Sequence, residues 1–120
     1  MVHLHRRRYL VFHVVSPGGV GKGLLINMIR NRTREMSEED FNRVRPWFVY
    51  YGSGWAIVRT WHRGVDDLVG MVKDLEGKEL KEGILKINIA GTSGTLKRAF
   101  YKFIPGPVRE RSHYREHQKK

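Results

Sequence analysis

The chain has 120 residues, no cysteine and a formal net charge of +11 at pH 7. This length suits one domain, and the lack of cysteine excludes disulfides, thiolate metal sites and cysteine nucleophiles. Hydrophobic residues make up 40% of the chain, which favours a globular protein, and the excess of Lys and Arg indicates a polyanionic partner, most commonly nucleic acid. No apolar run approaches the roughly 20 residues of a membrane span, so we expect a soluble, cytoplasmic protein without a membrane partner.

The spacing of apolar residues predicts strands and helices in alternation. Residues 8–16 and 83–91 alternate in the manner of strands, whereas 65–75 carries an apolar stripe at helical spacing. Gly52 and Ser53, between two β-rich runs, are typical of a hairpin turn. In chain order, we predict a strand at 8–16, a helix at 22–36, a polar link, a hairpin at 46–61, a helix at 65–75, a strand at 83–91 and a last helix capped by Ser93 or Thr95. The apolar stripe of this last helix is Leu96, Ala99, Phe100, Phe103 and Ile104.

A central hairpin with a helical crossover on each side indicates the α+β class. We predict a ferredoxin-like (split βαβ) sandwich, with an antiparallel four-stranded sheet, two helices on one of its faces and an added C-terminal helix. Residues 1–105 are expected to form this single domain. Residues 106–120 are strongly basic and lack apolar periodicity, so we expect a basic tail that is mobile or becomes helical only on binding.

The segment SPGGVGKGLL, residues 16–25, invites comparison with a P-loop. That motif starts with Gly and places Ser or Thr after its Lys, because the hydroxyl binds magnesium. Here Ser16 and Gly23 occupy those two positions, and the predicted sheet is antiparallel rather than parallel. We therefore interpret residues 17–23 as a glycine-rich joint, whose Lys22 can still meet an RNA phosphate.

Residues 53–60, SGWAIVRT, partly match the RNP1 pattern of RNA-recognition motifs. Trp55 is a candidate for base stacking, but Ile57 and Thr60 stand where aromatics are expected. This match gives an alternative function, a free-standing module of RNA-recognition-motif type for single-stranded RNA. The competing interpretation is that these side chains pack against helices or a partner protein.

The ionisable residues form no catalytic or metal-binding pattern. No histidine spacing matches a triad or a zinc site, and Asp66 and Asp67 diverge by about 100° on a helix. We therefore predict no side-chain catalytic site and no metal ion held by the protein.

Residues 91–98, GTSGTLKR, are the most informative stretch for binding. Glycines bracket Thr92 and Ser93 directly before a helix, so amides, hydroxyls and the positive end of the helix dipole converge there. Ordinary capping explains Ser93 but not Lys97 and Arg98, which the dipole disfavours in a first turn. This stretch is suited to a phosphate.

Three segments, RRYLVFHVVS (7–16), AIVRTWHRGVDDL (56–68) and AGTSGTLKRAFYKFI (90–104), resemble ribonuclease P protein component 2. This archaeal subunit has a counterpart in eukaryotic ribonuclease P and MRP, and the resemblance covers residues 7–105. It implies a ferredoxin-like protein that binds and stabilises the catalytic RNA of ribonuclease P for 5′ maturation of precursor tRNA. It also implies that the RNA holds the Mg²⁺ and performs the chemistry, so that the protein itself carries no cofactor.

The resemblance also implies partners and contacts. The partners are ribonuclease P RNA, precursor tRNA and a TIM-barrel-like protein, component 3, and such subunits can self-associate. Carried over by position, the expected RNA contacts are Arg8, Tyr9, Arg59, Arg63, Ser93, Gly94, Thr95, Lys97 and Arg98; charge alone adds Lys102, Arg6 and Arg7. The chain departs from the family in its leader, MVHLH, and in the GGVGKG run before its first helix.

Overall fold

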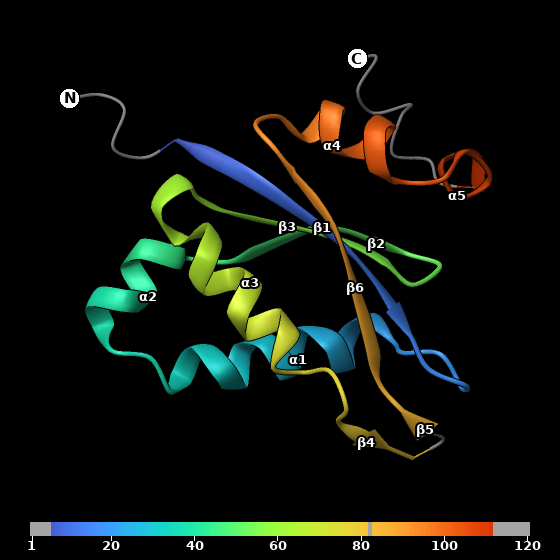
Figure 1. Cartoon of the computed structure of the whole chain (residues 1–120), viewed down its shortest axis with the longest axis horizontal. Helices are drawn as coiled ribbons and strands as arrows, with labels where there is room; N and C mark the ends of the chain where they lie inside the picture. Colours follow the sequence, from blue (N-terminus) through green and yellow to red (C-terminus); the bar gives the residue numbers. More distant parts are fainter. Residues whose placement is uncertain (1–5, 82, 112–120) are drawn as a thin grey trace.

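The computed structural model describes residues 6–81 and 83–111, and a four-stranded antiparallel sheet runs through its centre (Figure 1). The elements are β1 (Arg7–Val15), α1 (Lys22–Arg34), α2 (Glu38–Val44), β2 (Trp47–Gly52), β3 (Trp55–Trp61), the 3₁₀ turn η2 (His62–Gly64), α3 (Val65–Lys73), β4 (Glu79–Leu80), β5 (Gly83–Ile84), β6 (Lys86–Ser93), α4 (Leu96–Phe103) and α5 (Gly106–Arg111). The strand order is β2-β3-β1-β6, and every neighbouring pair is antiparallel. The predicted α+β class with an antiparallel four-stranded sheet is confirmed.

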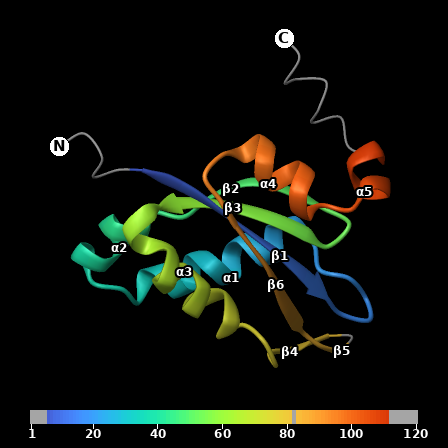
Figure 2. The same ribbon diagram turned by 45° about the horizontal axis from the view of Figure 1, so that its top comes forward.

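Helices cover both faces of this sheet, α1 and α3 on one side and α4 on the other (Figures 1 and 2). The alternation of β1 explains the two cores, because successive side chains of a strand point to opposite faces. Leu10 and Phe12 pack toward α1 and α3, as the sequence predicts, while Tyr9 and Val11 pack toward α4. A sheet covered on both faces buries the middle of its two central strands, residues 9–12 of β1 and 56–58 of β3.

The helix α2 stands where the sequence analysis expects only a polar link. Its signals are local: the Ser37 side chain accepts a hydrogen bond from the Asp40 amide, and acidic residues fill the first turn. The guanidinium of Arg43 then joins α2 to α3, at 2.6 Å from Asp40 and 2.8 Å from Asp67. These two carboxylates raise the pKa of Arg43. The polarity of this segment concealed a helix that has few apolar residues of its own.

The C-terminal helices seal the second face of the sheet. Ala99, Phe100 and Ile104, on the predicted apolar stripe of α4, are buried against β1 and β3. Gly91 permits this close approach, since a Cβ there would lie 2.6 Å from the Phe103 ring. The segment expected to start the tail forms α5, whose Val108 joins the same core, while residues 112–120 lie outside the described residues.

The glycine-rich loop joins β1 to α1, where the sequence analysis places it. Gly19 adopts a φ of +76°, a conformation that favours glycine, and α1 begins at Lys22 without a side-chain cap. The Tyr51 hydroxyl donates a 2.5 Å hydrogen bond to the Val20 carbonyl, and burial of this phenol raises the pKa of Tyr51. The loop therefore packs against the β2–β3 hairpin of an antiparallel sheet, whereas a P-loop belongs to a parallel sheet.

Candidate functional site

The antiparallel register brings three distant segments to one end of the sheet. The start of β1 faces the end of β3, with Arg7 opposite Trp61, and it also faces the end of β6, with Tyr9 opposite Ser93. The His62 amide extends the first pairing by donating a 2.6 Å hydrogen bond to the Arg6 carbonyl. The β1 start, the η2 turn and the β6–α4 loop consequently adjoin.

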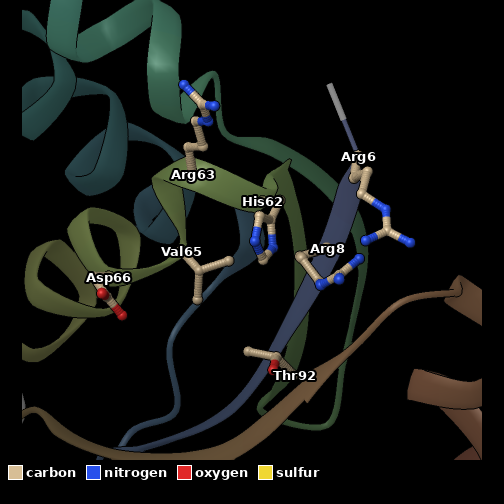
Figure 3. A pocket seen from close by; sticks show the side chains of 7 residues that line it. All are labelled: Arg6, Arg8, His62, Arg63, Val65, Asp66 and Thr92. Carbon is tan, nitrogen blue, oxygen red and sulfur yellow. The ribbon is translucent and has the colours of Figure 1, made fainter. Parts of the chain in front are cut away.

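Two open hollows lie at this end, with volumes of about 690 and 540 Å³. They share Arg6, Arg8 and Thr92, so they form one continuous surface. We call this surface the arginine cluster; its members are Arg6, Arg7, Arg8, His62, Arg63, Val65, Asp66, Thr92, Ser93, Gly94 and Thr95. Figure 3 shows Arg8 extending from β1 and Arg6 from the residue just before it, with His62 beside Arg8.

Positive charge dominates the arginine cluster. It contains four guanidinium groups, and Asp66 supplies its one carboxylate. Within residues 6–81 and 83–111, the ion pairs of arginine involve Arg32 and Arg43, both outside the cluster. The cluster arginines therefore keep their charge available for an external anion, and a guanidinium fork matches the geometry of phosphate oxygens.

The β6–α4 loop adds polar groups to the same surface. The buried Ser93 hydroxyl accepts from the Thr95 amide at 3.4 Å, and the Thr95 hydroxyl accepts from the Arg98 amide at 3.1 Å as the N-cap of α4. Gly94 lies beside Arg8, because a Cβ at position 94 would be in ordinary van der Waals contact with its guanidinium nitrogen, at 3.6 Å. The loop thus places the positive end of the α4 dipole beside the β1 arginines.

The structure brings together only part of the predicted contact set. Seven of the predicted residues line the arginine cluster: Arg6, Arg7, Arg8, Arg63, Ser93, Gly94 and Thr95. Lys97 and Arg98 are exposed in the adjoining first turn of α4, and Lys102 is exposed one turn further on. The assignment of RNA contacts to all these side chains stays a prediction.

Two predicted contacts lie elsewhere. Tyr9 is only 8% exposed and packs in the core beneath α4, because its position on β1 points it to that face. Arg59 pairs with Tyr9 across the sheet and does not line the cluster. Conversely, His62, Asp66 and Thr92 line the cluster but were not among the predicted contacts. The signal that could have found them is the strand register, which brings the ends of β3 and β6 to the same end of the sheet, one on each side of the β1 start.

The sheet does not present the open aromatic face of an RNA-recognition motif. The face that carries Ile57 and the partly buried Trp55 is covered by α4 and α5. The Trp55 ring stacks on His13 instead, with centroids 4.4 Å apart and planes at 11°. Desolvation lowers the pKa of His13 from its ordinary value of 6.5. The alternative reading of SGWAIVRT as a base-stacking strand is therefore not favoured.

Comparison with known proteins agrees with the resemblance seen in the sequence. No family model matches the chain. Ribonuclease P protein component 2 of Methanocaldococcus jannaschii is 28% identical over 100 residues, which span 82% of this chain and 73% of that protein. The chain is a relative of ribonuclease P protein component 2. The resemblance carried by residues 7–16, 56–68 and 90–104 is thus confirmed.

A solved structure shares the fold. One chain of the cryo-EM structure of yeast ribonuclease MRP superimposes with a TM-score of 0.61 at 16% identity, covering 96% of this chain and 94% of that one. In the described part of the chain, no helix is long and apolar enough to cross a membrane. No group of three or more histidine, aspartate or glutamate side chains gathers there to hold a metal ion.

Proposed function

We propose that this protein is a subunit of a ribonuclease P or MRP ribonucleoprotein and binds its RNA through the arginine cluster. The observation that carries the proposal is the agreement between two independent facts. The relative is ribonuclease P protein component 2, and the segments that resemble it meet at a group of arginines that form no ion pair within the described residues. Phosphates are the groups that such a surface neutralises.

In this proposal the protein acts on the RNA by electrostatics. A folded catalytic RNA crowds its phosphates, and guanidinium groups fixed on a rigid sheet lower the repulsion between them. The Mg²⁺ and the cleavage of precursor tRNA at its 5′ end belong to the RNA. Arg8 and Arg63, from two separate elements, would bridge neighbouring phosphates, and the Gly94 amide would receive another.

Finer parts of the proposal concern fold and setting. The ferredoxin-like (split βαβ) arrangement is supported by the order β2-β3-β1-β6, with β1 between β3 and β6. An archaeal, cytoplasmic setting is supported by the archaeal source of the relative. Component 3 and a second copy of the chain are proposed as protein partners on the strength of the resemblance.

Reconstitution tests the proposed function. The full chain is combined with ribonuclease P RNA and component 3, and cleavage of precursor tRNA is measured as magnesium is lowered. The expected result is cleavage at a magnesium concentration where the RNA with component 3 alone is inactive. The double variant Arg8→Ala, Arg63→Ala should lose this gain, and Lys86→Ala, at the far end of β6, should keep it. No gain with the unaltered chain would contradict the proposal.

A further inference from the structure

A second surface, mainly apolar, lies near the edge of the sheet opposite β6. It is a groove of about 350 Å³ between α1, α2 and the start of β2, and β2 is the sheet edge opposite β6. We call it the Trp47 groove; it is lined by Lys22, Ile26, Ile29, Arg30, Thr33, Phe41, Pro46, Trp47 and Phe48. None of these residues belongs to the arginine cluster.

The aromatic side chains that form the walls of the Trp47 groove are more exposed to solvent than large apolar side chains usually are. Trp47 is 62% exposed and Phe41 is 37% exposed, although both are large and apolar. The floor is formed by side chains that also contact the core, Ile29 and the partly buried Phe48. Contiguous apolar surface of this kind costs free energy in water and typically marks an interaction site.

The α1 helix gives the groove a charged rim. Lys22, Ile26, Ile29, Arg30 and Thr33 follow the i, i+4, i+7, i+8 and i+11 spacing of one helix face. Lys22 and Arg30 are eight residues apart, which corresponds to about 12 Å along the helix axis. None of the lining residues is acidic, and neither cation has a carboxylate within ion-pair distance in the described part of the chain.

We propose that the Trp47 groove binds a peptide segment of another protein that carries an apolar anchor side chain flanked by carboxylates. The anchor packs on Ile29 and Phe48 between Trp47 and Phe41, and the carboxylates pair with Lys22 and Arg30. An aromatic anchor residue at the centre of a desolvated pocket, with charges at the rim, is the usual anatomy of a protein interface. This inference does not rest on the proposed function.

The composition of the groove favours protein over RNA as its occupant. A nucleic-acid strand needs a row of cations to follow its phosphates, and this rim supplies two. The aromatic residues of the groove stand among the aliphatic Ile26, Ile29 and Pro46, which offer contacts to an apolar anchor side chain but no flat platform for stacked bases. A peptide on the groove would also leave the arginine cluster free for its own ligand.

Selection from a phage-displayed library of random linear peptides, with the full chain as bait, tests this proposal. Enriched peptides are expected to combine an aromatic or aliphatic anchor with Asp or Glu on both sides. Synthetic copies are then titrated by calorimetry into the unaltered chain and into variants. Trp47→Ala should weaken peptide binding by about tenfold or more. Arg30→Glu should weaken the binding of the acidic peptides and strengthen the binding of copies in which Lys replaces Glu.

Lys86→Glu is the matched control, since it makes the same change of charge at the opposite edge of the sheet. At a salt concentration that screens the difference in net charge, the Lys86→Glu variant should bind the peptides with the same affinity as the unaltered chain. Circular dichroism checks that each variant is folded. The proposal is overturned if no peptide is enriched, if Trp47→Ala and Lys86→Glu bind alike, if single-stranded RNA displaces the peptide, or if Trp47→Ala converts a dimer of this chain to a monomer.

Discussion

The guanidinium of Arg8 lies over Gly94, where even a single added carbon would touch it at 3.6 Å. These two residues come from opposite ends of the chain and meet because β6 runs antiparallel to β1. The contact joins the strand arginines to the N-terminus of α4 in one positive surface. We expect this surface to behave as a site for phosphates.

Loss of the cluster arginines should weaken RNA binding in a salt-dependent way. For Arg8→Ala with Arg63→Ala, the slope of log affinity against log salt concentration should become shallower by about 1 for each lost phosphate contact. Filter binding with ribonuclease P RNA across a salt series measures this slope. Lys86→Ala removes a lysine from the far end of the sheet and should leave the slope closer to that of the unaltered chain. Equal slopes for all three proteins would contradict a localised site.

Lys97 should affect stability and binding in opposite directions. A cation in the first turn of α4 opposes the helix dipole, so Lys97→Ala should stabilise the free protein by roughly 0.3–1 kcal/mol. The same change should weaken RNA binding if Lys97 helps to hold a phosphate. Urea unfolding gives the first quantity and filter binding the second. A variant that is less stable and binds RNA equally well would show that Lys97 serves the fold.

The strand alternation, the hairpin and the apolar stripe of α4 could be predicted because each is a local pattern. Ser37 offered a cap signal for α2, but the helix after it is mostly polar, and its partner Asp67 is distant in sequence. The arginine cluster was predicted in pieces, since register rather than local sequence decides that Arg63 and Arg8 line one hollow. Tyr9 was expected at the surface because nothing local shows that α4 covers its face.

Tyr9 should prove structural. Because its side chain packs in the core under α4, Tyr9→Ala should cost about 3 kcal/mol or more of unfolding free energy. Tyr9→Phe keeps the ring and should leave RNA affinity unchanged. Urea unfolding and filter binding on both variants separate the two roles. A large loss of RNA affinity in a stable Tyr9→Phe protein would restore Tyr9 as an RNA contact.

Gly64 should be essential to the position of the η2 turn. A Cβ at position 64 would lie 2.5 Å from the Arg43 carbonyl oxygen, so Gly64→Ala must displace backbone that holds His62 and Arg63. We expect a loss of about 1–3 kcal/mol in urea unfolding. Gly70→Ala is the control within the next helix, where an added Cβ meets nothing within 4 Å. It should stabilise the protein by roughly 0.5–1 kcal/mol, and similar losses in both variants would refute the steric explanation.

Directed cleavage of the RNA backbone tests, at one position, whether the arginine cluster faces the RNA. The natural chain has no cysteine, so Thr92→Cys creates a single attachment point for an iron chelate that generates hydroxyl radicals. Thr92 is exposed and lines both hollows of the cluster. Lys86→Cys provides the same probe at the far end of β6. If the arginine cluster faces the RNA, discrete cuts appear in ribonuclease P RNA from position 92 and few from position 86; equal cutting from both, or none from position 92, would show that the cluster faces elsewhere.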